Sequence, residues 1–477
     1  MRPSRLATLC CCASALLAAH AALAADADGG TEQPCPAGGA GCAQDDAELR
    51  RELEKALQQD AKAAQQAGTA APAEATEEAP PPPAPLYRGS QSLNPDISAI
   101  IDATGGFEGR TPAFQAGDDP VLRSTATAPG AGFALQELEL ALSAIVDPYL
   151  KGEVYLTIPN MRGLEIEEAF ATSTSLPFSL QIKAGSFRSA FGRQNGQHLH
   201  VQDFTRRPLV NAAFLGFDGL RGPGAQVSWL TPMPFYLALS AEAFSIGPVG
   251  ADLPVATFGG GKGTNVTTAG EAKAFFPFGK EWSVSAGLSS AFGVSPNSRM
   301  IQTFPPPGAN ALVDRRSVLV GGDLYVKWKP PNVSGSYQSL AWQTEVIFRH
   351  LGEGNAIFPG AGPATVPGEW DGGLYSQVVY QFARRWFLGL RGDVLGLPVS
   401  SAIPRTLRGA LSLTFQASEF SRLRVYAEVE HLGDARSVAN AAYTLAPDSL
   451  VASDPRTSGA AYLQLEVSIG AHGAHPY

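Results

Sequence analysis

Cysteine is scarce in this sequence: five residues in 477, none beyond Cys42. Cys10, Cys11 and Cys12 fall within an apolar leader, and the residues before them fit a lipoprotein cleavage site poorly. Cys35 and Cys42 either form a bridge that closes a short loop in an oxidising compartment or remain two thiols in a solvated tail. Neither alternative places cysteine chemistry at a functional site.

Long hydrophobic runs are also lacking after the first residues. Arg2 and Arg5 precede an apolar run from Leu6 to Leu23, and Ala22-Leu23-Ala24 stands before Ala25. This layout predicts a cleaved secretory signal over residues 1–24. No later run approaches the roughly 18 apolar residues of a membrane-spanning helix. We therefore expect an exported chain without a helical anchor.

An excess of positive charge is the third absence. Lys and Arg together number 35 against 44 Asp and Glu, a formal net charge of -9, and the pI is near 5.4. This balance gives no support to nucleic-acid binding, which requires clustered basic charge. The mean hydropathy of -0.02 is uninformative, because a barrel that alternates lipid-facing and water-facing residues also averages to neutrality.

The segment between the signal and about residue 93 cannot form a folded core. Residues 45–67 read as one amphipathic helix with an apolar stripe of Leu49, Leu53 and Leu57, too short to be stable alone in water. It is either a small coiled coil or a fraying spacer. The four prolines of 80–83 predict an extended linker. We expect a periplasmic segment over 25–69, a proline-rich linker over 70–93 and a barrel over 94–477.

From about residue 133 to residue 469 the chain alternates apolar and polar residues. In 407–416, Leu407, Leu411, Leu413 and Phe415 share one face, and Arg408, Ser412, Thr414 and Gln416 share the other. Segments 423–430 and 463–469 repeat this pattern. Alternation over about ten residues, bounded by turn residues, is the signature of a transmembrane β-barrel. The sequence predicts an all-β fold, an antiparallel barrel of about 16 strands.

The connections predict the same topology. We expect strands near 96–103, 133–147, 151–158, 163–174, 179–187, 223–231, 234–245, 265–276, 281–292, 316–329, 339–350, 371–382, 386–396, 405–417, 422–432 and 460–470. Tight turns alternate with long connections rich in Gly, Pro and Asn, as short periplasmic turns alternate with long outer loops in outer-membrane barrels. Trp229, Trp282, Trp328 and Trp386 lie beside the tight turns, which predicts one aromatic girdle at a membrane interface.

Several segments resemble a porin-like family of bacterial outer-membrane proteins. They are Asn94-Pro95-Asp96-Ile97-Ser98, Gly132-Phe133-Ala134-Leu135-Gln136-Glu137 with Asp147-Pro148-Tyr149, Gly185-Ser186-Phe187-Arg188-Ser189-Ala190-Phe191-Gly192-Arg193, and Gly470-Ala471-His472-Gly473-Ala474-His475-Pro476. The third is also similar to a segment of the phosphate-selective porins, which implies sixteen strands and a homotrimer. Some relatives are labelled zinc-regulated TonB-dependent outer-membrane receptors. Such receptors carry a folded plug domain before the barrel, whereas a low-complexity helix and linker are predicted here.

The long connection 188–222 is the principal candidate for a pore constriction. It carries Arg188, Arg193, Arg206 and Arg207, and if it folds inward this basic cluster would favour anions. If it folds outward, the same charges are solvated. The predicted lumen faces mix both signs, which implies weak selectivity. Lumen-lining candidates are Lys183, Arg391, Arg408, Arg424, Glu428 and Glu430.

Metal binding and catalysis have little support in the sequence. His198, His200 and Asp203 could ligate a transition metal, but two histidines fall short of the three or four fixed ligands of a stable site. No nucleophile with a neighbouring base is recognisable. We therefore expect no enzyme activity and no cofactor.

The sequence thus predicts a porin-like channel integral to the bacterial outer membrane, for passive diffusion of small hydrophilic solutes and with a possible preference for anions. Its expected partners are outer-membrane lipid, these solutes and further copies of the chain, not nucleic acid. Two alternatives stay open. The barrel could be non-conducting and serve binding or structure, or it could be a metal-regulated uptake protein.

Overall fold

The computed structural model describes residues 95–112, 114, 117–124, 128–216, 218–246, 257–258, 266–295, 315–331, 337–358, 362–366, 368–398, 403, 405–433 and 456–470. All of them belong to the unit Tyr87–Tyr477. The expected signal peptide, the helix over 45–67, the proline-rich linker, Cys35 with Cys42, and His472 with His475 lie outside the described residues.

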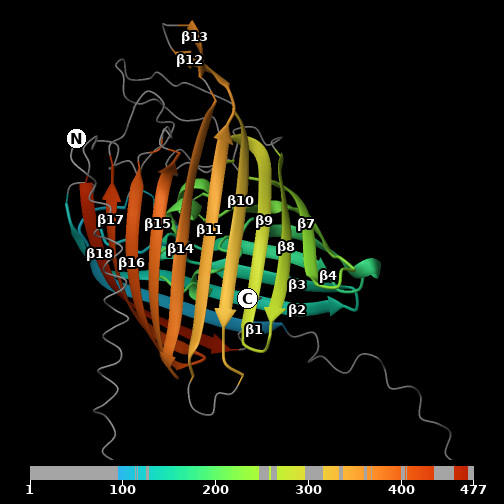
Figure 1. Ribbon diagram of the computed structural model, residues 1–477, viewed down its shortest axis with the longest axis horizontal. Helices are drawn as coiled ribbons and strands as arrows, with labels where there is room; N and C mark the ends of the chain where they lie inside the picture. Colours follow the sequence, from blue (N-terminus) through green and yellow to red (C-terminus); the bar gives the residue numbers. More distant parts are fainter. Residues whose placement is uncertain are drawn as a thin grey trace, which may run out of the picture. The chain divides into compact units, whose positions relative to one another are not determined.

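Sixteen antiparallel strands close into a barrel, as the sequence predicted, and strand β1 completes the closure by pairing with β18. The two walls cross in projection because the strands are tilted (Figure 1). The strands are β1 (Asp96–Glu108), β2 (Gly130–Asp147), β3 (Leu150–Thr157), β4 (Glu165–Ser173), β5 (Leu180–Arg188), β6 (Arg221–Leu230), β7 (Tyr236–Ser245), β8 (Val266–Phe278), β9 (Trp282–Ser295), β10 (Arg315–Trp328), β11 (Ser339–Leu351), β14 (Glu369–Ala383), β15 (Trp386–Leu397), β16 (Thr406–Ser418), β17 (Ser421–Leu432) and β18 (Arg456–Gly470).

One connection holds structure that the sequence did not predict. Between β11 and β14, strands β12 (Gly354–Phe358) and β13 (Gly362–Val366) form a separate two-stranded sheet, which projects beyond the end of the barrel (Figure 1). Each strand has five residues and begins with glycine, so neither is long enough for an alternating pattern to stand out.

The barrel wall is apolar outside and charged inside. On β17, Val425 is 52% and Val429 58% exposed, whereas the intervening Tyr426 is completely buried and the neighbouring Arg424 is 1% exposed. This is the reverse of a soluble protein, in which Arg is almost never fully buried. The exposed residues form an apolar belt around the wall, which we define by Ile182, Val227, Leu288, Phe292, Val320, Phe348, Leu390, Leu411, Val425, Val429, Leu463 and Leu465.

Aromatic rings gather at the end of the barrel where the turns are short. Trp282 and Trp328 lie 6.3 Å apart between ring centroids, and Trp386 lies 4.9 Å from Phe415. Phe235 stacks on Phe276 at 5.4 Å. Trp282 is 45% exposed. The rings therefore face outward at one rim, as amphipathic side chains at a membrane interface do.

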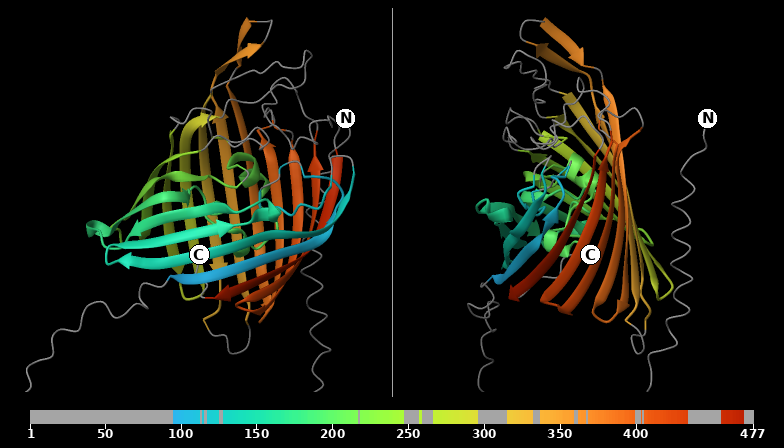
Figure 2. Two further views of the ribbon diagram at one scale, coloured as in Figure 1. Left: turned by 180° about the vertical axis from the view of Figure 1, so that it is seen from behind. Right: turned by 90° about the vertical axis from the view of Figure 1, so that its left-hand side faces the viewer.

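The connection between β5 and β6, residues 189–220, lies inside the barrel, and we call it the inserted segment. It contains the 3₁₀ turn η4 (Leu199–Val201) and the short helix α3 (Leu209–Phe214), which lies against β11, β14 and β15. Figure 2 shows it enclosed by the strands. Within the described ranges, no helix has the length and apolar character needed to span a membrane.

Candidate functional site

The inserted segment leaves the wall at the motif Gly185-Ser186-Phe187-Arg188-Ser189-Ala190-Phe191-Gly192. Gly185 (φ 136°) and Gly192 (φ 66°) adopt conformations that side chains disfavour. A Cβ at Gly185 would overlap the backbone oxygen of Ala169. Phe187 and Phe191 are each 1% exposed. The motif is thus a hinge: glycine allows the bend and the two phenylalanines anchor its sides.

Hydrogen bonds from two further wall strands hold the chain after this hinge. Ser189 Oγ donates to Glu242 Oε2 at 2.6 Å, and the amide of Ala190 donates to Glu242 Oε1 at 2.8 Å. The amide of Gly192 donates to Ser289 Oγ at 2.9 Å. Because Glu242 and Ser289 lie on β7 and β9, these bonds tie the start of the segment to strands other than β5 and β6, between which it runs.

Three of the four constriction candidates are neutralised by buried carboxylates. Arg188 pairs with Glu167 and with Asp218. Arg206 pairs with Glu428 and, at 3.2 Å, with Asp119, and Arg207 pairs with Asp118 at 2.7 Å. The side chains of Arg188, Arg206 and Arg207 are at most 2% exposed. Their charge therefore stabilises the inserted segment instead of facing a solute.

Asp118 and Asp119 show that a second connection enters the lumen. They belong to the β1–β2 connection, one of the long connections predicted as outer loops, and both are buried. Gln136 on β2 donates through Nε2 to the backbone oxygens of Asp118 and Thr205, at 2.6 and 2.9 Å. One wall residue thus joins both connections.

The other lumen-lining candidates lie on the inner face, most of them in contact with the inserted segment. Arg391 pairs with Asp393 at 3.0 Å and donates to the backbone oxygen of Arg206 at 2.8 Å. Arg408 pairs with Glu430 at 2.7 Å. Arg424 donates to Gln464 Oε1 and to the backbone oxygen of Gln202.

Part of the lumen is apolar, whereas the sequence predicted charged residues of both signs on the lumen faces. Leu319, Ile347 and Leu395 point inward and are completely buried, in a cluster with Leu209 and Val210 of α3. Because α3 covers these wall residues, they need no contact with water.

A cavity of about 750 Å³ lies between β3–β8 and the start of the inserted segment. Its lining holds two cations, Lys183 and Arg193, that form no ion pair within the described residues. Lys183 Nζ lies 4.5 Å from the Phe170 ring centroid. Arg193 lies 3.8 Å from the Tyr325 ring centroid and donates through Nε to Gln343. The cations Lys151 and Lys273, in contrast, pair with Glu153 and Glu271.

Beside this cavity the two histidines of the inserted segment meet a group of glutamates. His198 Nδ1 lies 3.1 Å from Glu139 Oε2 and 3.3 Å from Glu167 Oε2, and its Nε2 lies 2.9 Å from Glu168 Oε1. His200 Nδ1 lies 3.4 Å from Glu139 Oε2. Asp203, predicted as a third ligand, is exposed and belongs to neither metal-competent group of the described residues.

Burial and charge act oppositely on His198. Burial disfavours the protonated ring, but the carboxylates of Glu167 and Glu139 outweigh it and raise the pKa of His198 well above its usual value. Both ring nitrogens of His198 thus lie against carboxylates, between β2 and β4.

Two β-bulges explain why the sequence did not reveal these glutamates. The register of β1 and β2 shifts between Asp102 and Ala103, and both Gln136 and Glu137 are buried. The register of β3 and β4 shifts between Tyr155 and Leu156, and both Glu167 and Glu168 are buried. A bulge turns two consecutive residues to one side. The adjacent acidic residues Glu167-Glu168 were the sequence signal that could have revealed the bulge in β4. In a regular strand one of these two glutamates would face lipid.

Comparison with known proteins gives one sequence relative and several structural ones. No protein-family profile matches this chain. An uncharacterized protein of Aquifex aeolicus (strain VF5) is 35% identical over 363 residues, 72% of this chain and 70% of the relative. The anion-selective porin from Comamonas acidovorans superposes with a TM-score of 0.45 at 11% identity, over 79% of this chain and 99% of the porin. The outer membrane channel DcaP of Acinetobacter baumannii gives 0.47 at 11% identity, over 80% and 99%.

Proposed function

We propose that this chain, which belongs to the same family as the Aquifex aeolicus protein, is an outer-membrane porin-like channel. Small hydrophilic solutes, preferentially anions, diffuse through it passively. The observation that carries this proposal is the distribution of polarity over a closed barrel. An apolar belt outside and charged residues inside suit a wall that separates lipid from an aqueous path.

The resemblance to phosphate-selective porins implies a homotrimer. Chemical cross-linking of the protein in detergent tests this oligomeric state.

The preference for anions rests on Lys183 and Arg193. Many other charges of the lumen are paired, whereas these two cations border the cavity without a carboxylate partner among the described residues. A narrow path with low-dielectric walls strengthens the effect of each unpaired charge on the local anion concentration. Arg206 and Arg207 do not contribute, because Asp118, Asp119 and Glu428 neutralise them.

A non-conducting barrel is the second candidate, and the filled lumen favours it. Two connections enter the barrel, and α3 packs against one wall through apolar contacts. A barrel with its lumen closed in this way would not pass solutes. Its role would be to present the outer connections, including the β12–β13 hairpin.

Single-channel recording distinguishes the two candidates. The purified full-length mature protein is inserted into a planar lipid bilayer in 1 M KCl. A channel gives discrete, reproducible conductance steps, and a non-conducting barrel inserts without steps. Insertion is verified in parallel by the heat-modifiable shift of the folded protein on a gel, so that the absence of steps from folded protein rejects the channel.

A further inference from the structure

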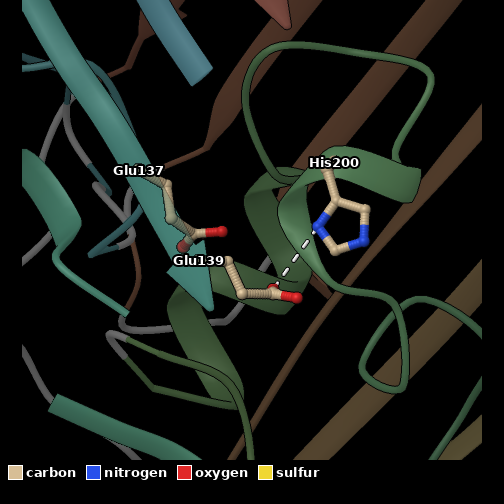
Figure 3. Close-up of side chains that lie close together, drawn as sticks. All are labelled: Glu137, Glu139 and His200. Carbon is tan, nitrogen blue, oxygen red and sulfur yellow. Dashed lines mark ion pairs between the residues drawn. The ribbon is translucent and has the colours of Figure 1, made fainter. Parts of the chain in front are cut away.

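We propose that Glu137, Glu139 and His200 bind a divalent transition-metal ion of the zinc type, and that this ion ties the inserted segment to the barrel wall. Figure 3 shows the two carboxylates projecting from β2 toward the imidazole of His200, which lies in η4. The inference does not depend on conductance, since a conducting and a non-conducting barrel would both contain the site.

The distances suit a single ion. One ligand atom from each of the three residues lies within 4.8 Å of the others, and His200 Nδ1 lies 3.4 Å from Glu139 Oε2. Ligand atoms at about 2.1 Å from a tetrahedral zinc ion are about 3.4 Å apart. Small side-chain rotations of Glu137 therefore suffice to close three ligands around an ion, with a fourth position for water.

The donor atoms are available. Glu137 is 6% exposed, yet its carboxylate forms no hydrogen bond or ion pair with the described residues. Glu139 is 1% exposed, and its Oε1 has no hydrogen-bond partner. A buried carboxylate oxygen without a partner is strongly disfavoured, which is why such groups are paired or coordinate metals. An ion between these residues would satisfy the Glu137 carboxylate and Glu139 Oε1.

The neighbouring group of Glu139, Glu167 and His198 also has metal-competent spacing, but its atoms are already engaged. His198 bridges Glu139 and Glu168, and Arg188 Nε donates to Glu167 Oε1 at 3.0 Å. These contacts orient Glu139 from outside the proposed ligand set, as groups that hydrogen-bond to metal ligands do. The bulge at Gln136 and Glu137 supports the assignment, since bulges re-aim side chains at functional sites.

The donor set selects the class of ion. One imidazole and two carboxylates suit Zn²⁺ and its first-row neighbours. Ca²⁺ and Mg²⁺ prefer a shell made entirely of oxygen ligands. The cluster also favours a cation by charge, because four glutamates face one arginine and two imidazoles and carry excess negative charge even when both imidazoles are protonated.

Calorimetry on the folded, chelator-treated mature protein tests the proposal. The background variant carries Cys35→Ser, Cys42→Ser, His472→Ala and His475→Ala, which removes the other thiols and imidazoles that could hold zinc near the termini. We expect this protein to bind one Zn²⁺ and to bind Mg²⁺ at least a hundredfold more weakly. Glu137→Gln and His200→Gln should each weaken Zn²⁺ binding at least tenfold. Glu419→Gln and His431→Gln, both at exposed positions, are the matched controls and should bind as the background does.

Two results would overturn the site: no Zn²⁺ binding by the folded background protein, or unchanged affinity in both Glu137→Gln and His200→Gln. Cobalt substitution provides a readout that needs no variant in the site. Co²⁺ in the proposed four-coordinate site gives intense visible absorption bands, whereas the weak spectrum of hydrated Co²⁺ would contradict the proposal even if a variant failed to fold.

Discussion

At the scale of residues, the interior is organised by the pairing of buried charges. Arg206, Arg349 and Arg424 are among the largest fully buried side chains described. Transfer of a guanidinium from water is costly, and only close carboxylates or several acceptors offset it. Arg206 shows how this is achieved, because its partners Asp119 and Glu428 come from the β1–β2 connection and from β17.

Replacement of Arg206 by Met should lower the free energy of unfolding by about 3–5 kcal/mol, the usual cost of leaving a buried ion pair without one partner. Asp119 and Glu428 would remain buried with fewer partners. Lys183→Met, at a site with ring contacts only, should cost about 1 kcal/mol or less. Urea unfolding in lipid vesicles measures both, and equal costs would show that the Arg206 pairs contribute no stability.

The proposed anion preference also makes a prediction at single residues. The double variant Lys183→Ala, Arg193→Ala should shift the reversal potential in a KCl gradient toward cation preference, because it removes the two unpaired cations of the cavity. The shift should be larger at 0.1 M than at 1 M salt, where the Debye length falls from about 10 Å to about 3 Å.

The matched control for that experiment is Lys280→Ala, Arg385→Ala, which removes one lysine and one arginine from exposed turns. It should leave the reversal potential unchanged. If both double variants shift the potential equally, total charge and not the cavity sets the preference. If neither does, Lys183 and Arg193 lie outside the conduction path.

At the scale of elements, the strands could be predicted from the sequence and the interior could not. A strand with one face in lipid and one in the lumen must alternate, so period two marks β16, β17 and β18 clearly. The path of the inserted segment depends on contacts between Ser189 and Glu242, which lie 53 positions apart. No local pattern encodes such a pairing. The bulges at Gln136 and Glu167 break the alternation, which is why Glu137, Glu167 and Glu168 were missed.

The hinge of the inserted segment makes an element-scale prediction. Gly185→Ala should destabilise the fold by about 2–4 kcal/mol, since it combines backbone strain with overpacking against Ala169 and Phe170. Gly409→Ala is the control, because a Cβ there meets nothing within 4 Å and the residue lies in a regular strand. Its stability should equal or slightly exceed that of the wild type. A neutral Gly185→Ala in the same urea experiment would mean that the wall relaxes at the hinge.

At the scale of the whole barrel, the closed sheet and the distribution of polar and apolar residues together favour a membrane-spanning barrel. Pairing of β1 with β18 leaves no free sheet edge among the sixteen barrel strands, and all backbone groups of the wall can bond to neighbouring strands. Only such a closed sheet or a helix satisfies the backbone within lipid. The apolar belt is then the surface that lipid covers, and the paired charges inside are the surface that it never meets.

Lipid contact of the belt is therefore the central claim, and fluorescence quenching measures it most directly. In a background with Cys35→Ser and Cys42→Ser, single variants Leu411→Cys, Val425→Cys and Glu419→Cys are labelled with an environment-sensitive fluorophore and folded into vesicles. The account predicts that lipids brominated at mid-chain quench the labels at 411 and 425, whereas aqueous iodide quenches only the label at the turn position 419. Quenching of the labels at 411 and 425 by iodide and not by brominated lipid would place the belt in water and contradict a membrane-spanning barrel.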